Sequence, residues 1–212
     1  NGEIVLGNRD RLLALSCAAG GAFEGTAVGC GTGSIPGAIK QIELTDEKIS
    51  YTTIGNKQPV GICGSGFIDL LAELLQRGIM TKTAKITQDF YITQTIRLTQ
   101  TDIYQLITAK AAVRTGWQVL LKQYPAQLSD VKNIYISGGF GNFINIKNAI
   151  TIGLIPDVEN QKVVKIGNGA LEGARELLLC QEAQELCNRI AQQVVHIRPN
   201  EVEKNFDYLL AK

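Results

Sequence analysis

The sequence predicts an α/β protein with a mixed β-sheet and flanking helices. Short β-prone segments alternate along the chain with longer segments whose apolar residues recur at helical spacing. Two pairs of the β-prone segments have the form of hairpins, which add antiparallel edges to the sheet. Hydrophobic residues make up 45% of the chain and charged residues 19%, which is ordinary for a globular protein of this class.

The first predicted hairpin lies at the very start of the chain. Residues 3–6 and 11–16 are β-prone, and the Gly7-Asn8-Arg9-Asp10 segment between them has the composition of a turn. Because two strands alone are only marginally stable, a hairpin at residue 3 implies a further strand before it. The chain begins at Asn1 rather than at a Met. We therefore expect it to be a fragment of a larger protein, truncated at its N-terminus.

The middle of the chain contains the two clearest helices. A short helix is expected in the small-residue segment 18–29, and alternating apolar and polar residues predict a second hairpin over 39–53. Helical spacing of apolar residues predicts helices over 65–78 and 102–123. The polar, Thr-rich segment 79–100 between them is expected to be a connection with short strands.

The last third of the chain is predicted to contain two strands and two helical regions. The strands are expected at 134–136 and 163–166, and a helical region bent near Cys180 follows over 168–190. A final helix is expected to start near Asn200. Its apolar positions are Phe206, Leu209 and Leu210.

Charge and cysteine content exclude several classes of function. Lys and Arg number 21 against 20 Asp and Glu, so no net charge favours nucleic acid or acidic lipid. No apolar run approaches the ~20 residues that cross a bilayer, and we expect a cytoplasmic protein. Five cysteines without a C-x-x-C motif argue against a disulfide framework and against a zinc or iron–sulfur site. The cysteines expected instead to be small buried hydrophobes are Cys17, Cys30, Cys63, Cys180 and Cys187.

Glycines concentrate in three segments, residues 61–66, 137–142 and 29–33. Gly64-Ser65-Gly66 opens a predicted helix, where free N–H groups suit phosphate. Gly138-Gly139 directly follows a predicted strand, where a ligand can approach amides that no Cβ shields. None of the three segments fits a named phosphate-loop motif. A single glycine pair is more often part of a turn than of a ligand site. Because two glycine pairs stand here at strand-to-helix junctions, a simple turn and a nucleotide-binding loop remain equally open interpretations.

Residues for other chemistries are scarce. His196 is the single histidine and has no flanking signal of a nucleophilic site. Lys110 lies on the apolar stripe of the helix predicted over 102–123, and Arg114 follows one turn later. Lys110 is explained either as a side chain whose ammonium reaches water at the edge of the stripe, or as a cation held for ribose or phosphate.

Six segments of the chain, in order, resemble the C-terminal domain of the reductive activators of corrinoid proteins. The most specific are Pro59 to Leu71 and the Ser-Gly-Gly-Phe-Gly-Asn segment 137–142. The six segments are residues 1–7, 18–25, 36–39, 59–71, 137–142 and 152–156.

This resemblance implies the ribonuclease H-like ATPase fold of acetate and sugar kinases, Hsp70 and actin, in which ATP and Mg²⁺ bind between two lobes. Residues 1–212 would form the second lobe. Full-length members carry a [2Fe–2S] domain, which this chain would lack. They use ATP to drive electron transfer onto cob(II)amide, which restores the cob(I)amide used in methyl transfer. The fragment alone would then be inactive, and it would bind ATP weakly or not at all, because half of the cleft is missing.

The resemblance also assigns residues to the nucleotide. Asn1 and Gly2 match the end of the second phosphate loop, whose usual Asp-Ile-Gly-Thr opening is absent, and with it the Asp that would hold Mg²⁺. Gly138, Gly139, Phe140 and Asn142 match the adenosine loop. No catalytic residue and no metal ligand is predicted. The predicted nucleotide-binding residues are Asn1, Gly2, Gly64, Ser65, Gly66, Lys110, Gly138, Gly139, Phe140 and Asn142.

Two alternatives remain open from the sequence. The chain could be a lobe of a small-molecule kinase of the same fold, for which Glu24 is the only candidate catalytic carboxylate. It could instead dock a corrinoid protein, or a second copy of itself in a homodimer, with vestigial nucleotide loops. Substitutions at Gly138 and Gly139 separate these alternatives.

Overall fold

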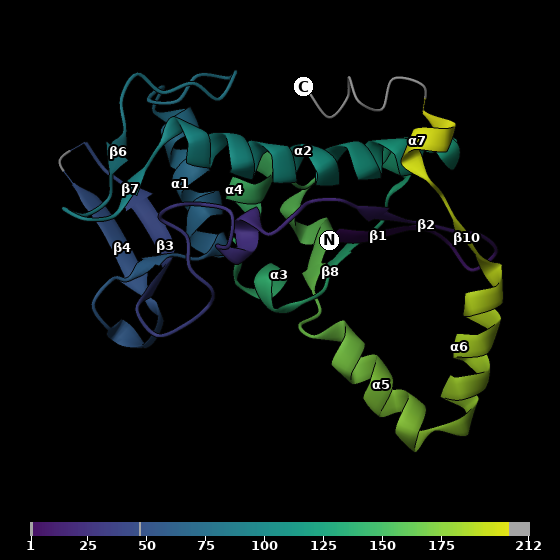
Figure 1. Cartoon of the computed structure of the whole chain (residues 1–212). Coiled ribbons are helices and arrows are strands. Elements are labelled where there is room, and N and C mark those ends of the chain that lie inside the picture. Colours follow the sequence, from purple (N-terminus) through teal and green to yellow (C-terminus); the bar gives the residue numbers. More distant parts are fainter. Residues whose placement is uncertain (1, 47, 204–212) are drawn as a thin grey trace. The chain divides into compact units, whose positions relative to one another are not determined.

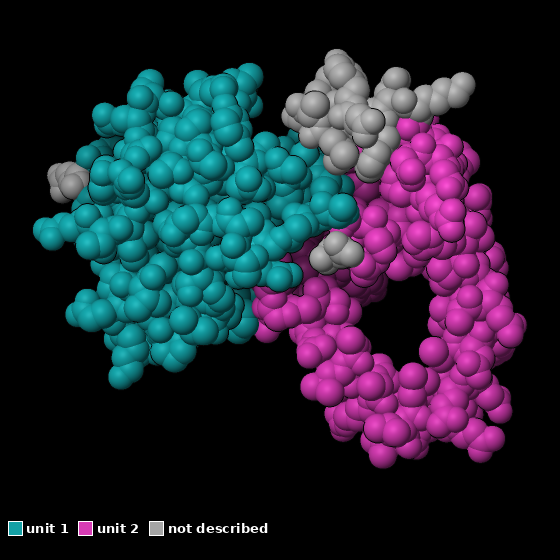
Figure 2. Space-filling model, viewed as in Figure 1, with its two compact units in different colours: residues 1, 18–114, 143–157 teal, residues 2–17, 115–142, 158–212 magenta. Residues whose placement is uncertain are grey.

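The computed structural model describes residues 2–46 and 48–203 (Figure 1). These residues form two compact units, coloured separately in Figure 2, and each is described by itself. That residues 1–212 form one lobe, with 79–100 as a connecting segment, stays a prediction. Within the described residues, unit 1 comprises 18–114 and 143–157, and unit 2 comprises 2–17, 115–142 and 158–203.

Unit 1 is built on a mixed three-stranded sheet in the order β4-β3-β5. β3 (Ala38–Leu44) pairs with β4 (Ile49–Thr53) as the predicted antiparallel hairpin, and with β5 (Gly61–Ile62) in parallel. The predicted helix α1 (Gly64–Gln76) begins two residues after β5 and packs on β3. The apolar residues of α1 bury one face of β3, the face on which the alternation of apolar and polar residues places the apolar ones. The core residues of this layer are Ile39, Ile42, Leu44, Phe67, Ile68, Leu70, Leu71 and Leu74.

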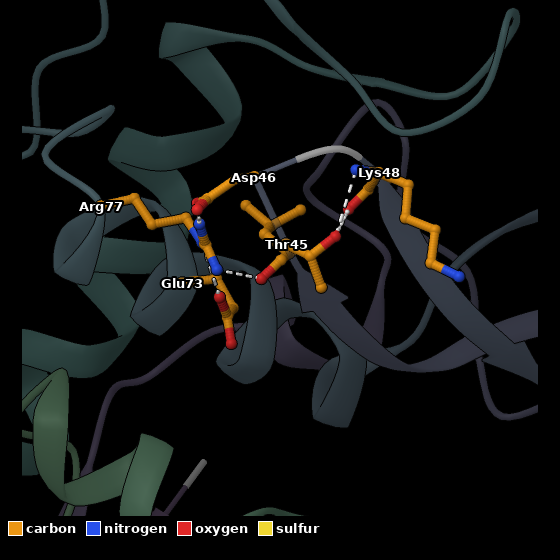
Figure 3. Close-up of polar contacts among 6 residues, drawn as sticks. Thr45, Asp46, Lys48, Glu73 and Arg77 are labelled. Atoms are coloured by element: carbon orange, nitrogen blue, oxygen red, sulfur yellow. Dashed lines mark hydrogen bonds and ion pairs between the residues drawn. The ribbon is translucent and has the colours of Figure 1, made fainter.

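The end of α1 is tied to the turn between β3 and β4 by Arg77 (Figure 3). Its guanidinium contacts the Asp46 carboxylate at 2.9 Å and Glu73 at 3.2 Å, and it donates to the Leu44 carbonyl. Hydrogen bonds to Glu73 and Asp46 raise the pKa of Arg77 further above its usual value. Thr45 closes the same turn, because its Oγ1 donates to the Lys48 carbonyl oxygen at 3.1 Å.

The other elements of unit 1 are short, except for α2 (Gln100–Gln123), which contributes to both units. The helix expected over 18–29 is wrong beyond the 3₁₀ turn η1 (Ala22–Glu24), because Gly20 and Gly25 take positive φ at its two sides. The predicted connection 79–100 contains two short paired strands. The remaining elements are η2 (Ile54–Asn56), β6 (Phe90–Tyr91), β7 (Arg97–Leu98) and α4 (Ile146–Thr151).

Unit 2 contains the predicted N-terminal hairpin and a separate pair of parallel strands. In the first sheet β1 (Gly2–Gly7) runs antiparallel to β2 (Leu12–Cys17), and β10 (Val194–His196) runs parallel to β2. In the second sheet β8 (Ile134–Ile136) pairs with β9 (Val163–Lys165) in parallel. The short helical elements of this region are η3 (Leu128–Asp130), α3 (Gly139–Phe143) and η4 (Asn160–Lys162).

The long helical region near the C-terminus breaks at Cys180, as predicted. Cys180 has an extended backbone between α5 (Gly169–Leu179) and α6 (Gln181–Gln193), and neither helix contains a buried residue. The prediction that the cysteines are buried hydrophobes is confirmed for Cys17 and Cys63. It is wrong for Cys187 on α6, which is exposed, and Cys30 and Cys180 are only half-buried.

The last described helix is α7 (Pro199–Val202), near the predicted start at Asn200. Its predicted apolar positions Phe206, Leu209 and Leu210 lie outside the described residues. Among residues 2–46 and 48–203, no helix is both long and apolar enough to cross a membrane.

Candidate nucleotide-binding site

The loop of residues 137–142 leaves the end of β8 beside the loop that leaves β9. The two strands are parallel and in register from Ile134 opposite Val163 to Ile136 opposite Lys165. The carboxyl ends of parallel neighbours open at the same edge of a sheet, where α/β proteins bind ligands. The loops are joined directly, because the amide of Gly138 donates to the Gly167 carbonyl at 2.7 Å.

Open space lies beside both glycines of the first loop. A Cβ built on Gly138 or on Gly139 meets no heavy atom within 4 Å. Gly138 has φ +100°, a conformation that residues with a side chain rarely adopt. A flat ligand can therefore approach this backbone closely. Only one of the two amides is available, since that of Gly138 is engaged by Gly167, and the expectation that both face a ligand is corrected.

Ser137 fastens the two loops together. Its Oγ accepts a hydrogen bond from the amide of Gly169 at 3.1 Å and donates to the Gly167 carbonyl at 3.4 Å. Asn168 then caps α5, with its side-chain oxygen accepting from the Leu171 amide at 3.1 Å. The position of the glycine pair thus depends on a second loop 30 residues away in the chain.

This second loop was missed from the sequence. Gly167-Asn168-Gly169 follows a predicted strand just as Gly138-Gly139 does, and Gly167 likewise has positive φ with open space beside it. The sequence does contain a signal for this loop, namely an Asn between two glycines before an apolar helical stretch. That pattern is typical of a turn followed by an N-capped helix.

Phe140 and Asn142 occupy the short helix α3 after the glycines. Phe140 is 39% exposed, and Asn142 is also exposed. Gly141 between them is buried. A side chain has no room at this position, because a Cβ there would lie 2.3 Å from Cγ2 of Ile136. Lys165 of β9 donates to the Asn142 carbonyl at 3.2 Å, which adds another link between the loop and the neighbouring strand.

Gly2, assigned to a phosphate loop, is the first residue of β1 and pairs with Cys17. It is half-buried, and its role toward phosphate stays a prediction. Asn1 lies outside the described residues. Glu3, the next residue of β1 after Gly2, accepts a hydrogen bond from the Ser16 hydroxyl on the paired strand.

The segment Gly64-Ser65-Gly66 has a packing role in unit 1. All three residues are buried, and a Cβ on Gly66 would lie 2.4 Å from the Ile39 carbonyl oxygen. Ser65 Oγ donates to the Lys40 carbonyl at 2.8 Å. Close contact between α1 and β3 therefore explains why small residues stand here. Phosphate binding by these residues stays a prediction.

The third glycine segment is fastened to the start of α2. The buried carboxylate of Asp102 accepts from the Gly29 amide at 2.6 Å and from Thr99 Oγ1 at 2.7 Å. Thr99 and Asp102 also bond each other's amides as a capping box. Burial, with a further effect of Asp102, raises the pKa of the Cys30 thiol to about 12. Cys30 is thus an inert thiol next to a structural loop.

Lys110 is buried on the first half of α2 and 7% exposed. Burial lowers its pKa, and the positive charge of Arg114 lowers it further. The side chain is therefore more enclosed than an ordinary lysine at the edge of an apolar stripe. Its role in nucleotide binding stays a prediction.

The residues around the glycine loop and the acidic and cysteine side chains bear on two of the implied groups, the nucleotide and the metal centres. The open backbone at Gly138 and Gly139 fits the flat base and ribose of a nucleotide. For metal ions, no group of three or more His, Cys, Asp or Glu side chains gathers among the residues that the structure describes. An iron–sulfur cluster is held by four cysteine thiolates, and the described residues bring no such set together.

The chain matches, over residues 1–211, the family described as the C-terminal domain of RACo, the ASKHA domain. It belongs to this family. The match confirms the ribonuclease H-like ATPase fold and the resemblance to reductive activators. A solved structure of a reductive activator for a corrinoid, iron–sulfur protein is 36% identical with a TM-score of 0.90, covering 98% of this chain and 37% of that chain.

Two curated relatives carry related names. The corrinoid activation enzyme RamQ of Eubacterium limosum is 35% identical, and the match covers 93% of this chain and 38% of RamQ. A reductase of the Co(II) methylated amine-specific corrinoid protein from Methanosarcina barkeri is 27% identical, over 97% of this chain and 43% of the reductase. The chain thus spans about two fifths of the length of the curated relatives it matches.

Proposed function

We propose that this chain supplies an ATP-binding part of a protein that reductively activates a corrinoid protein, returning its cob(II)amide to cob(I)amide. The observation that carries the proposal is the open Gly138-Gly139 backbone at the carboxyl ends of two parallel strands. Membership of the ASKHA family and the names of three similar proteins support it.

The residues of this chain bind and orient the nucleotide in this proposal. The backbone of Gly138 and Gly139 contacts the adenosine, and Ser137 holds the loop in place through Gly167 and Gly169. ATP, when bound, supplies the free energy that favours one conformation over another. A ligand shifts such an equilibrium only by its difference in affinity for the two conformations. The corrinoid protein that docks would then respond to that change.

The test is Gly139→Trp in the full-length protein. Because open space surrounds a Cβ at Gly139, the indole fills the ligand's space and leaves the fold intact. Gly173→Trp on α5 is the matched control, since a Cβ there also meets nothing within 4 Å. We expect calorimetric ATP binding and corrinoid reduction to be lost in the first variant and kept in the second.

Corrinoid activation that survives Gly139→Trp would contradict the proposal. In that case the chain serves as a docking module with vestigial nucleotide loops. The exposed leucines Leu178 and Leu179, at 84% and 75%, would then be the first surface to examine.

A further inference from the structure

Two cations lie one helical turn apart on α2 without an acidic partner. Lys110 is 7% exposed, and Arg114 follows it at i+4. Within residues 2–46 and 48–203, no carboxylate forms an ion pair with either side chain, and neither donates a hydrogen bond to a side chain. Buried ammonium groups in proteins are otherwise paired.

The two buried acids of unit 1, Asp69 and Asp102, are committed elsewhere. Asp69 accepts from the Asn148 side chain at 2.8 Å and from the Ile42 amide at 3.3 Å. Asp102 is used by Gly29 and Thr99. The two buried carboxylates of unit 1 therefore accept hydrogen bonds from amide and hydroxyl groups, and neither forms an ion pair with Lys110 or Arg114.

Arg114 has a defined place on the surface of unit 1. A Cβ built on Gly153 would lie 2.9 Å from Nη1 of Arg114 and 3.7 Å from its Cζ. Gly153 follows α4 with φ +75°, and its amide donates to the Ile150 carbonyl at 2.8 Å. The absence of a side chain at Gly153 thus leaves room for the guanidinium beside the turn, and Arg114 as a whole is exposed.

This arrangement is unfavourable without a ligand. Like charges at i and i+4 repel on a helix, and burying an unpaired ammonium costs solvation free energy. Consistently, both burial and Arg114 lower the pKa of Lys110. An anion placed between the two side chains removes both penalties, because the ammonium supplies a point charge and the guanidinium a planar pair of donors.

We propose that Lys110 and Arg114 form a binding site for a phosphate group, with Gly153 making room for the arginine. The ligand class is a phosphate ester or polyphosphate, whether free or attached to a nucleoside. The site is built from unit 1 alone. It therefore does not depend on the glycine loop of unit 2.

The experiment measures binding of inorganic pyrophosphate to the full-length protein by calorimetry. We expect Arg114→Ala to weaken binding about 10-fold, the usual effect of losing a charge-assisted contact. Arg114→Lys should keep part of the affinity, because charge remains without the planar fork. Lys110→Met, which preserves the apolar stem, should also weaken binding. Arg189→Ala, an exposed helical arginine on α6, should bind as the unmodified protein does.

Further ligands identify what the site holds. If the phosphate comes from a nucleotide, Arg114→Ala weakens ATP binding and leaves adenosine binding unchanged. If a free phosphate compound is the ligand, pyrophosphate binding falls alone. Gly139→Trp should abolish adenosine binding and spare pyrophosphate binding, so the two proposals can fail separately. Equal pyrophosphate affinity in the Arg114→Ala and Arg189→Ala variants, or no affinity in the unmodified protein, would overturn the inference.

Discussion

Helices α1 and α5 have similar apolar content and opposite environments. Of the thirteen residues of α1, from Gly64 to Gln76, ten are buried against its own unit. Of the eleven residues of α5, from Gly169 to Leu179, none is buried. Apolar composition therefore did not decide burial. The difference is that α1 has β3 to pack on, whereas α5 begins at a loop that serves the glycine pair.

The two regions have different tasks. Unit 1 gains its stability from the α1–β3 layer, where Phe67 and Leu74 are fully enclosed. The 137–142 and 166–169 loops of unit 2 are held mainly by hydrogen bonds and leave backbone exposed. Regions with few buried apolar contacts open more readily. We expect substitutions in the first region to affect folding and those in the second to affect binding.

The largest expected difference is in the free energy of unfolding, between alanine substitutions at Phe67 of α1 and at Leu178 of α5. Phe67→Ala removes a side chain that is 0% exposed and should lower the free energy of unfolding by about 3–5 kcal/mol. Leu178→Ala removes one that is 84% exposed and should change it by less than about 0.5 kcal/mol. Denaturant unfolding of the 212-residue chain measures both. A comparable loss in Leu178→Ala would mean that α5 packs against something in solution.

A smaller effect is expected from the buried carboxyl of Asp69 in α1. Burial, opposed by hydrogen bonds from Asn148 and Ile42, raises its pKa above the ordinary 3.8. The folded protein then holds this proton more tightly than the unfolded chain. The stability that Asp69 contributes is therefore full below pH 3.8 and declines as the pH rises through the raised native pKa.

The measurement compares the unmodified protein with Asp69→Asn, whose side chain does not titrate. The difference in free energy of unfolding between the two proteins should shift in favour of Asp69→Asn as the pH rises from 3.8 toward neutrality. Glu73 contributes in the same direction, since its charge also raises the pKa of Asp69. A difference that stays constant across this range would show that Asp69 has an ordinary pKa.

Sequence patterns located the helices and strands better than they predicted which of these elements pack against one another. Periodicity located α1 and both hairpins, because local spacing fixes which residues face one side. Periodicity could not show that the N-terminus of α1 packs against β3, because Gly66 and Ile39, which meet there, are far apart in the sequence. Likewise Gly138-Gly139 stood out as a glycine pair after a strand. Its partner loop was missed because only the parallel pairing of β8 with β9 brings Gly167 beside it.

The smallest effect concerns Ser137, which joins those two loops. Ser137→Ala removes the hydrogen bonds with Gly167 and Gly169 and leaves the β8–β9 pairing unchanged. Because both bonds are exposed to water, we expect a loss of about 1 kcal/mol in ATP binding, or about fivefold in Kd, and no change in unfolding. Ser137→Thr keeps the hydroxyl and is the matched control. If the alanine variant binds ATP as tightly as the unmodified protein, the amide bond from Gly138 to Gly167 alone positions the loop.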